Sequence, residues 1–457
     1  MSQMQYPTVH CPSTLLLSTG GHMSQDKIIG FIGTGRIGPP VIRSLLSAGY
    51  TVKVHDKYRS AATDVIAAGA TWAETPRDVA KGTDSLITCL AQPSHVNEAM
   101  LGDNGAAHAM QAEAIWINLS TTDYHSTIRI RDVLKSNGAF CLEAPVSNLS
   151  HMGVDFGNSS VYCAGEKAGY DSAKGILEAV AQISFFTGDI GSAQAVKLLT
   201  NLIFYGAASI SGDCLAISQH AGIPTHWMWE KIAGSPAASV TVTQFIPMLF
   251  DGSYDTSCSL AIGVKDMALT LAFAEERGVT LPLSRLVCDR YALAGQVYDP
   301  SQNHLKVLKL TEDANDMAIR IPGFIAPSKY GIDPSFVISE QMDTDALGRM
   351  TPKLPAHYRA PEFTPTAHQS DLIDTLIRIM AAANHALNAE AILLGQSVGL
   401  DRAVIEEMIV WSVGTNWMIE NIGGYDPDAA HLPGIDTLSG GLHLPFLSNV
   451  LDVLRGV

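Results

Sequence analysis

Basic residues are scarce in this chain. Lys and Arg together number 29 among 457 residues, against 45 Asp and Glu, which gives a formal net charge of −16. Nucleic acids and anionic membranes repel an acidic surface, because both carry negative charge. We therefore expect no nucleic-acid partner and no membrane partner. A small anionic substrate is still allowed, since it needs only a local cationic site.

Cysteine is also scarce, and neither cysteine nor histidine shows the spacing of metal ligands. The seven cysteines include no CxxC pair, and the 15 histidines include no HxxH pair. An odd number of scattered cysteines is typical of reduced thiols. We therefore expect no metal site, and a cytoplasmic location.

The chain lacks an obvious membrane-spanning run and an obvious leader. The longest uncharged runs, such as residues 232–250, contain Pro236 and Gln244, which is typical of buried helix and loop. Residues 1–26 show no basic start followed by an apolar stretch. We expect a mobile extension there, before the first strand.

What the chain does contain is a long alternation of strand and helix patterns. Short β-rich runs recur between amphipathic segments up to residue 191, at 27–33, 51–56, 85–91, 114–120 and 139–146 among others. Such alternation predicts a parallel, doubly wound sheet. The expected fold class is an α/β Rossmann-type N-terminal domain followed by an all-α domain.

Helical patterns dominate the rest of the chain. Residues 192–300 predict an all-helical domain, residues 301–369 an irregular linker with prolines near its end, and residues 370–457 a second helical unit. The dinucleotide-binding domain would then cover residues 27–191, after the extension 1–26.

The two helical units resemble each other when the chain is shifted by 177 residues. At that offset Gln219 aligns with Gln396, and Gly222 aligns with Gly399. We predict that the all-α domain is duplicated and that its copies pack as an intramolecular pseudo-dimer, with a homo-dimer as the alternative.

A glycine-rich motif marks the first junction between strand and helix. It has the form GxGxxG and consists of Gly33, Thr34, Gly35, Arg36, Ile37 and Gly38. The first glycine permits a tight turn, the second lets a pyrophosphate approach the backbone, and the third lets the helix pack on the strand. The helix N-terminus supplies N–H groups for the phosphates. The motif therefore predicts a dinucleotide cofactor.

The end of the second strand bears on the choice of cofactor. Asp56 lies there, and a carboxylate at this place accepts hydrogen bonds from ribose hydroxyls and repels a 2′-phosphate. This favours NAD. Lys57 and Arg59 follow directly and could hold a 2′-phosphate instead, so NADP remains possible.

Polar residues at later strand ends and on the first long helix form a second candidate group. Ser120 and Ser147 follow strands whose carboxyl ends face the ligand crevice of an open α/β sheet. Lys197 and Asn201 are four residues apart, so a helix presents them on one face. A lysine beside a nicotinamide can protonate a nascent alkoxide, or take a hydroxyl proton if its pKa is lowered.

These motifs stand in the order found in the β-hydroxyacid dehydrogenases, the family of 3-hydroxyisobutyrate dehydrogenase and 6-phosphogluconate dehydrogenase. Residues 27–298 resemble that family. Besides the glycine motif, the resemblance rests on residues 118–121 (NLST), 143–147 (EAPVS), 188–201 and 264–267 (VKDM).

The resemblance implies an NAD(P)-dependent oxidoreductase that acts on the CH–OH group of a small-molecule substrate. It makes Lys197 the general acid/base. The residues that it assigns to the substrate are Ser120, Ser147, Asn148 and Asn201. Those that it assigns to the cofactor, besides the glycine motif and Asp56, are Leu90, Ala91, Thr121 and Lys265.

Two departures from the family narrow the expected reaction. Asn148 stands where the family usually has the first of two glycines that receive the substrate carboxylate, so the acid end would be held differently. Phe204 stands where 6-phosphogluconate dehydrogenase has a proton-donating glutamate, so we expect no oxidative decarboxylation. An imine reductase and a non-catalytic dinucleotide-binding protein are the alternatives, and Lys197 argues against both.

Overall fold

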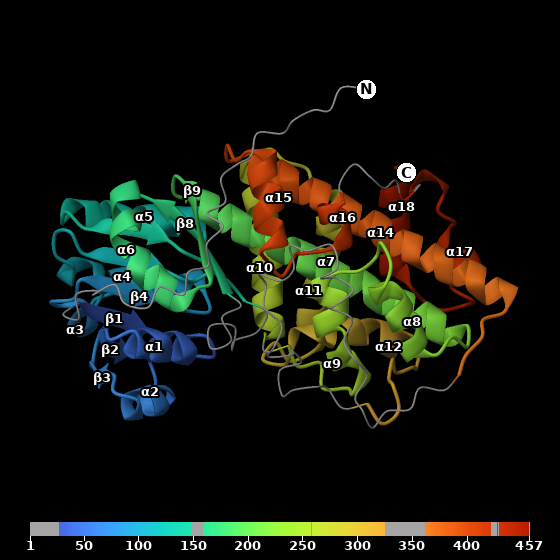
Figure 1. Ribbon diagram of the computed structural model, residues 1–457, viewed down its shortest axis with the longest axis horizontal. Coiled ribbons are helices and arrows are strands. Elements are labelled where there is room, and N and C mark those ends of the chain that lie inside the picture. The colour runs from blue at the N-terminus through green and yellow to red at the C-terminus, as the bar shows by residue number, and fades with distance from the viewer. Residues whose placement is uncertain are drawn as a thin grey trace.

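The computed structural model describes residues 27–148, 159–256, 258–324, 362–421, 427 and 429–456 (Figure 1). The predicted extension 1–26, the segment after Asn148 and the middle of the predicted linker lie outside these residues. Within them, an α/β part ends at Gly188 and a helical part begins at Ser192. The two parts lie side by side along the longest axis of the molecule (Figure 1).

One sheet of nine strands forms the centre of the α/β part, as far as the structure describes it. The strands are β1 (Ile28–Ile32), β2 (Thr51–His55), β3 (Thr71–Trp72), β4 (Ser85–Thr88), β5 (Ile115–Asn118), β6 (Phe140–Glu143), β7 (Val146–Asn148), β8 (Ser159–Gly165) and β9 (Ile183–Gly188). Their order is β3-β2-β1-β4-β5-β6-β8-β7, and β9 pairs with β8. β1 to β6 are paired in parallel, with the strand order of a Rossmann domain, which confirms the expected fold class.

The far edge of the sheet differs from the prediction of a parallel sheet. β8 runs antiparallel to both β6 and β7. Only Ala144 and Pro145 separate β6 from β7, so the two strands continue in one direction and β8 returns between them. Strands joined without a crossover helix pair antiparallel.

Helices cover both faces of the sheet. They are α1 (Gly38–Ser47), α2 (Thr63–Ala67), α3 (Pro76–Ala80), α4 (Pro93–Leu101), α5 (Tyr124–Ser136) and α6 (Lys167–Val180), with 3-10 turns at Arg59–Ala62 and Ala107–Ala109. One apolar core includes Leu45 of α1 and Leu177 of α6. A second core includes Met100 of α4 and Leu134 of α5. Both cores bury the strands and so fix the positions of the strand ends.

Two long helices, α7 (Ser192–His220) and α14 (Ala367–Gln396), pack along each other in the helical part (Figure 1). Around α7 lie α8 (Thr225–Ala233), a π-helical turn (Thr241–Phe245), α9 (Pro247–Phe250), α10 (Leu260–Glu276) and α11 (Pro282–Val297). Around α14 lie α15 (Arg402–Val410), α16 (Trp417–Glu420), a 3-10 turn (Ala429–His431), α17 (Ile435–Leu438) and α18 (Pro445–Arg455). One apolar core runs through both groups.

The two helical groups repeat each other at the expected offset. α8 and α15 start and end 177 residues apart. Ser239 and Asn416, which are also 177 residues apart, form an antiparallel bridge with each other. The backbone N–H groups of Val240 and Trp417 each donate across it, over 3.0 and 2.9 Å, and they exchange under the same offset. A local two-fold axis between equivalent segments produces such reciprocal bonds.

Part of the predicted irregular linker is helical. Residues His304–Leu308 form a 3-10 turn that leads into α12 (Lys309–Ala314). Leu305, Val307 and Leu308 are fully buried. Leu308 lies against Gly212 of α7, where a Cβ would come within 2.7 Å of its side chain. The tertiary contacts of these apolar residues stabilise a helix that the surrounding polar sequence did not predict.

α7 is long and apolar enough to cross a membrane by length and composition alone. However, its most apolar stretch of 18 residues is entirely buried within the protein. The core helix of a globular domain meets the same description, and the packing of α7 against α14 and α10 accounts for its apolar surface.

Candidate active site

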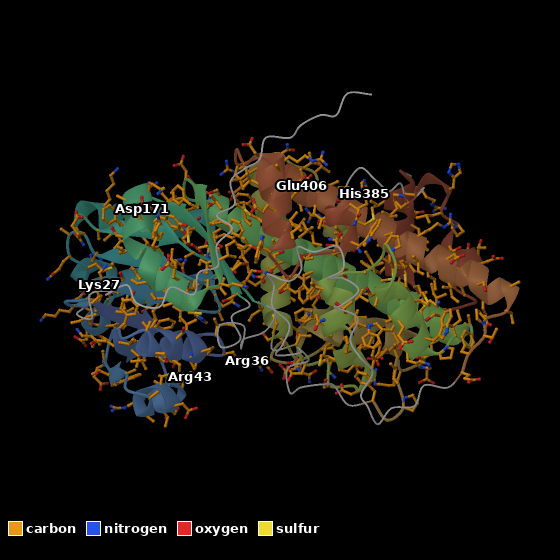
Figure 2. The ribbon with its side chains drawn as sticks, in the orientation of Figure 1. Lys27, Arg36, Arg43, Asp171, His385 and Glu406 are labelled. Atoms are coloured by element: carbon orange, nitrogen blue, oxygen red, sulfur yellow. The ribbon has the colours of Figure 1, made fainter. Side chains whose placement is uncertain are left out.

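A cavity of about 510 Å³ lies where the α/β part meets the helical part. The glycine motif and the ends of β4, β5 and β7 line one side of it, and α7 and α10 line the other. Residues predicted for the site that line the cavity are Gly35, Arg36, Ile37, Leu90, Ala91, Ser120, Thr121, Lys197, Asn201 and Lys265. Figure 2 places Arg36 at the boundary between the two parts.

The glycine motif has the backbone shape that a dinucleotide needs. Gly33 has φ +106°, and a Cβ there would lie 2.3 Å from the carbonyl oxygen of Cys89. A Cβ on Gly38 would lie 2.1 Å from the carbonyl oxygen of Gly33, so neither position tolerates a side chain. Gly35 has no atom within 4 Å of its Cβ position, which leaves its backbone open to a pyrophosphate.

Asp56 lies at the end of β2 and is held beside the glycine motif. Its carboxylate accepts hydrogen bonds from the backbone N–H of Thr34 (2.7 Å) and of Tyr58 (3.0 Å). Arg59 is exposed and forms an ion pair with Glu74 (3.4 Å). A fixed carboxylate therefore faces the adenosine side, while one of the two neighbouring cations is paired elsewhere.

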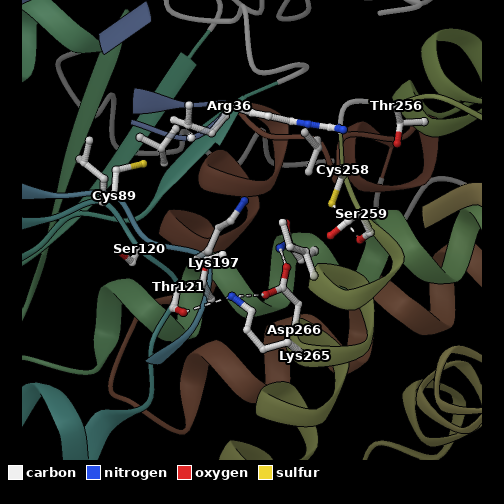
Figure 3. Close-up of a pocket in the computed structure, with 18 of the residues that line it drawn as sticks. Arg36, Cys89, Ser120, Thr121, Lys197, Thr256, Cys258, Ser259, Lys265 and Asp266 are labelled. Carbon is white, nitrogen blue, oxygen red and sulfur yellow. Dashed lines mark hydrogen bonds and ion pairs between the residues drawn. The ribbon is translucent and has the colours of Figure 1, made fainter. Parts of the chain in front are cut away.

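Lys197 lies in the second turn of α7, and its side chain points into the cavity (Figure 3). Burial lowers the pKa of its ammonium group to about 8, while the charge of Asp266 acts in the opposite direction. Nζ forms no hydrogen bond or ion pair with any residue that the structure describes. A lysine in this state can exchange a proton near neutral pH.

Asp266 connects the other polar residues of the helical wall. Its carboxylate accepts hydrogen bonds from Nδ2 of Asn201 (2.8 Å) and from the hydroxyl of Tyr205 (3.1 Å), and it forms an ion pair with Lys265 (3.0 Å). Nζ of Lys265 also donates to the carbonyl oxygen of Thr121 (3.2 Å; Figure 3). The network thus joins α7 and α10 to the loop after β5.

Ser120 and Ser147 occupy different environments. The hydroxyl of Ser120 accepts a hydrogen bond from the backbone N–H of Leu90 (2.9 Å) and lines the cavity. Ser147 is fully buried and is not among the lining residues, whereas its neighbour Val146 is. The side chain of Asn148 lies outside the described structure. The structure therefore brings Ser120 to Lys197 but does not bring Ser147 to the cavity.

Two buried side chains fix the start of α7. The carboxylate of Glu143 accepts a hydrogen bond from the backbone N–H of Gly191 (2.8 Å), and burial raises its pKa to about 7. Nε2 of Gln194 donates to the carbonyl oxygen of Ser120 (3.0 Å), and its Oε1 accepts from the backbone N–H of Thr122 (3.2 Å). These bonds set the position of Lys197 relative to the strand ends.

Sequence reasoning missed several residues of the cavity wall. Asp266, Tyr205, Cys258 and Phe245 line it, and none was named as a site residue. The VKDM motif contains Asp266 and is the signal that could have found it. Among the described residues, no group of His, Cys, Asp or Glu is arranged to hold a metal ion.

Comparison with known proteins first gives the class, a dinucleotide-binding oxidoreductase. A model of the NAD-binding domain of 6-phosphogluconate dehydrogenase matches residues 28–189, and a model of the NAD-binding region of NADP-dependent 3-hydroxyisobutyrate dehydrogenase matches residues 191–311. Together these ranges cover more than half of the chain. The chain belongs to the β-hydroxyacid dehydrogenase family, and it is an NAD(P)-dependent oxidoreductase that acts on CH–OH groups.

Individual relatives agree with this assignment. The uncharacterized oxidoreductase YkwC of Bacillus subtilis is 26% identical over 284 residues, which are 62% of this chain and 98% of that protein. Glyoxylate/succinic semialdehyde reductase 2 of Arabidopsis thaliana is 28% identical over 266 residues, 58% of this chain and 74% of that protein. The structure of 3-hydroxyisobutyrate dehydrogenase from Salmonella typhimurium has a TM-score of 0.58 at 24% identity and covers 62% of this chain and 100% of that one, so it shares the fold.

Proposed function

We propose that the chain transfers a hydride between a nicotinamide and the hydroxyl-bearing carbon of a small β-hydroxyacid, with Lys197 as the general acid/base. The observation that carries this proposal is the position of Lys197, a lysine of lowered pKa on the cavity wall opposite the glycine motif. The bound nicotinamide would supply hydride transfer at its C4 atom.

The residues of the chain would divide the remaining work. Lys197 would protonate the carbonyl oxygen during reduction and take the hydroxyl proton during oxidation. Ser120 and Asn201 would orient the substrate, since both line the cavity. Leu90, Ala91 and Thr121 would lie along the cofactor, as would Lys265 through its bond to Thr121.

The charges of the cavity support an acidic substrate. Arg36, Lys197 and Lys265 line it, against the one carboxylate of Asp266 in that lining set, which Lys265 already pairs. A local excess of cations in a chain of net charge −16 attracts an anion to this place. Phe204 also lines the cavity and has no proton to donate, which supports a reaction without decarboxylation of the 6-phosphogluconate type.

We further propose NAD as the preferred cofactor and the second helical group as a substitute for a partner subunit. The hydrogen bonds that hold Asp56 support the first, and the reciprocal bridge between Ser239 and Asn416 supports the second. A homo-dimer of whole chains is the alternative assembly.

An absorbance assay at the nicotinamide band tests the reaction. We expect turnover with NAD and small β-hydroxyacids, and none with cyclic amines or with 6-phosphogluconate. Turnover of amines alone would indicate an imine reductase instead. Cofactor binding without turnover of any hydroxyacid, sugar acid or amine would indicate a non-catalytic dinucleotide-binding protein.

A further inference from the structure

The end of the cavity farthest from the glycine motif is apolar. Lys197, Asn201 and Phe204 follow each other at helical spacing on α7, and all three line the cavity. Phe204 lies two turns beyond Lys197, which corresponds to about 10 Å along the helix. A substrate whose reacting carbon lies at Lys197 can therefore reach Phe204 only through an extended substituent.

Aromatic contacts build the wall around Phe204. Phe245 packs edge-on against it, with ring centroids 4.7 Å apart, and both side chains line the cavity. The ring of His304 lies 5.1 Å behind Phe204, and burial lowers the pKa of this imidazole to about 3, so it is uncharged at neutral pH. The wall therefore offers apolar surface and no charge of its own.

The third side of this apolar end comes from the second helical group. Val413 lies between α15 and α16 and lines the cavity. Its neighbour Gly414 packs closely on α7, since a Cβ there would lie 3.1 Å from the carbonyl oxygen of Thr200. The bridge between Ser239 and Asn416 holds this segment in place. Residues more than 150 positions apart thus enclose one apolar space.

The polar groups of the cavity lie apart from this apolar end. Thr256, Cys258 and Ser259 form a polar margin toward which the long side chain of Arg36 extends (Figure 3). Arg36 forms no hydrogen bond or ion pair with any residue that the structure describes. A substrate with a carboxylate at one end and an apolar group at the other would match both regions.

We propose that the substrate is a hydroxyacid with a phenyl-sized apolar substituent, and that Phe204, Phe245 and Val413 enclose that substituent. The proposal deepens the proposed function and rests on it for the reacting group. The apolar subsite itself is a binding property, so it can be tested apart from turnover. Burial of a phenyl group in such a subsite discriminates against a methyl group, because more apolar surface leaves water.

The first test compares kcat/KM, with NAD, for 3-hydroxy-3-phenylpropionate and for 3-hydroxybutyrate. We expect the wild-type enzyme to prefer the phenyl compound by about tenfold or more, and we expect Phe204→Ala to lower this ratio by about tenfold. Val413→Ala, a smaller change in the other helical group, should lower the ratio in the same direction. Phe324→Ala is the matched control, because Phe324 is as buried as Phe204 (6% exposed) but does not line the cavity.

The second test measures binding of 3-phenylpropionate, which has no hydroxyl to oxidise, by calorimetry in the presence of NAD. We expect Phe204→Ala to weaken binding by about tenfold and Phe324→Ala to leave it unchanged. If no hydroxyacid is turned over but this difference holds, the proposed function fails and the apolar subsite stands. A wild-type preference for 3-hydroxybutyrate, or equal binding of 3-phenylpropionate by the wild type and Phe204→Ala, overturns the proposal.

Discussion

At the scale of single residues, the environment of each ionisable group decides what it can do. Lys197 has lost most of its water and faces the cavity, so its ammonium form is destabilised. Asp56 accepts two backbone N–H bonds that fix its carboxylate beside the glycine motif. Glu143 is fully buried and holds its charge at a cost that one hydrogen bond only partly offsets.

Replacing Asp56 by Ala should weaken the preference for NAD. The carboxylate accepts ribose hydroxyls and repels a 2′-phosphate, so its loss removes a favourable term for NAD and an unfavourable one for NADP. We expect the ratio of kcat/KM for NAD to that for NADP to fall by about tenfold or more. Asp64→Ala, an exposed acidic residue of the same domain, is the control. A wild-type enzyme that is more efficient with NADP would contradict the assignment.

Glu143 should make folding stability depend on pH. Its pKa is raised from 4.5 to about 7 in the folded protein, so between these values the folded state binds a proton more tightly than the unfolded state. Its contribution is favourable below pH 4.5 and is lost as the pH rises toward 7. Urea unfolding at several pH values should therefore show a smaller loss of stability for Glu143→Gln than for the wild type. A loss of equal size in both, or in the surface control Glu178→Gln alone, would exclude this role.

At the scale of elements, the relation of α7 to its neighbours determines the geometry of the site. Glu143 and Gln194 fix the start of α7 to the sheet, and Asp266 of α10 fixes Asn201 one turn after Lys197. α7 therefore presents its polar face at a defined place between the sheet and α10. Changes in these contacts should act on the chemistry through Lys197.

Asp266→Asn should shift the pH dependence of oxidation. The charge of Asp266 raises the pKa of Lys197 against the larger effect of burial, so removal of that charge should lower this pKa below about 8. Oxidation needs the neutral amine, and its rate should then reach half of its maximum at a lower pH than in the wild type. The measurement is kcat/KM for hydroxyacid oxidation against pH. A midpoint that stays in place or moves upward would show that the charge of Asp266 does not act on Lys197.

At the scale of the whole molecule, two helical groups bury one continuous core. α14 packs along α7, and Leu387 of α14 lies against Gly206, where a Cβ would come within 2.6 Å of it. Val413 of the second group lines the cavity. The second group therefore contributes both to stability and to the site.

Loss of this core should inactivate the enzyme. Leu387 is fully buried and Leu393, on the same helix, is 52% exposed. We expect Leu387→Asp to aggregate or unfold and Leu393→Asp to remain soluble, because only the first places a charge inside the core. Removal of residues 366–457 should give an aggregating or inactive product for the same reason. Solubility and light scattering measure both effects, and a soluble, active, monomeric truncation would refute this account.

The sequence predicted those features that local patterns encode. The GxGxxG motif, the strand ends and the helical spacing of Lys197 and Asn201 all depend on neighbouring residues. The edge of the sheet at β8 and the helix at residues 309–314 depend on tertiary contacts, as does the place of Val413 in the cavity wall. Local periodicity does not contain those contacts. Ser147 shows the same limit, since its strand end was expected to face the cavity and its neighbour Val146 does so instead.

The measurement that tests the central claim most directly is the effect of Lys197→Ala on turnover and on cofactor affinity. Lys197 is proposed to act on the reacting hydroxyl, while the backbone of the glycine motif holds the dinucleotide. We expect kcat to fall by about 10²–10⁴-fold. NAD affinity, followed by nicotinamide or protein fluorescence, should stay within a few-fold, and the exposed control Lys174→Ala should match the wild type in both. Near-wild-type turnover by Lys197→Ala would remove Lys197 from the mechanism and contradict the account.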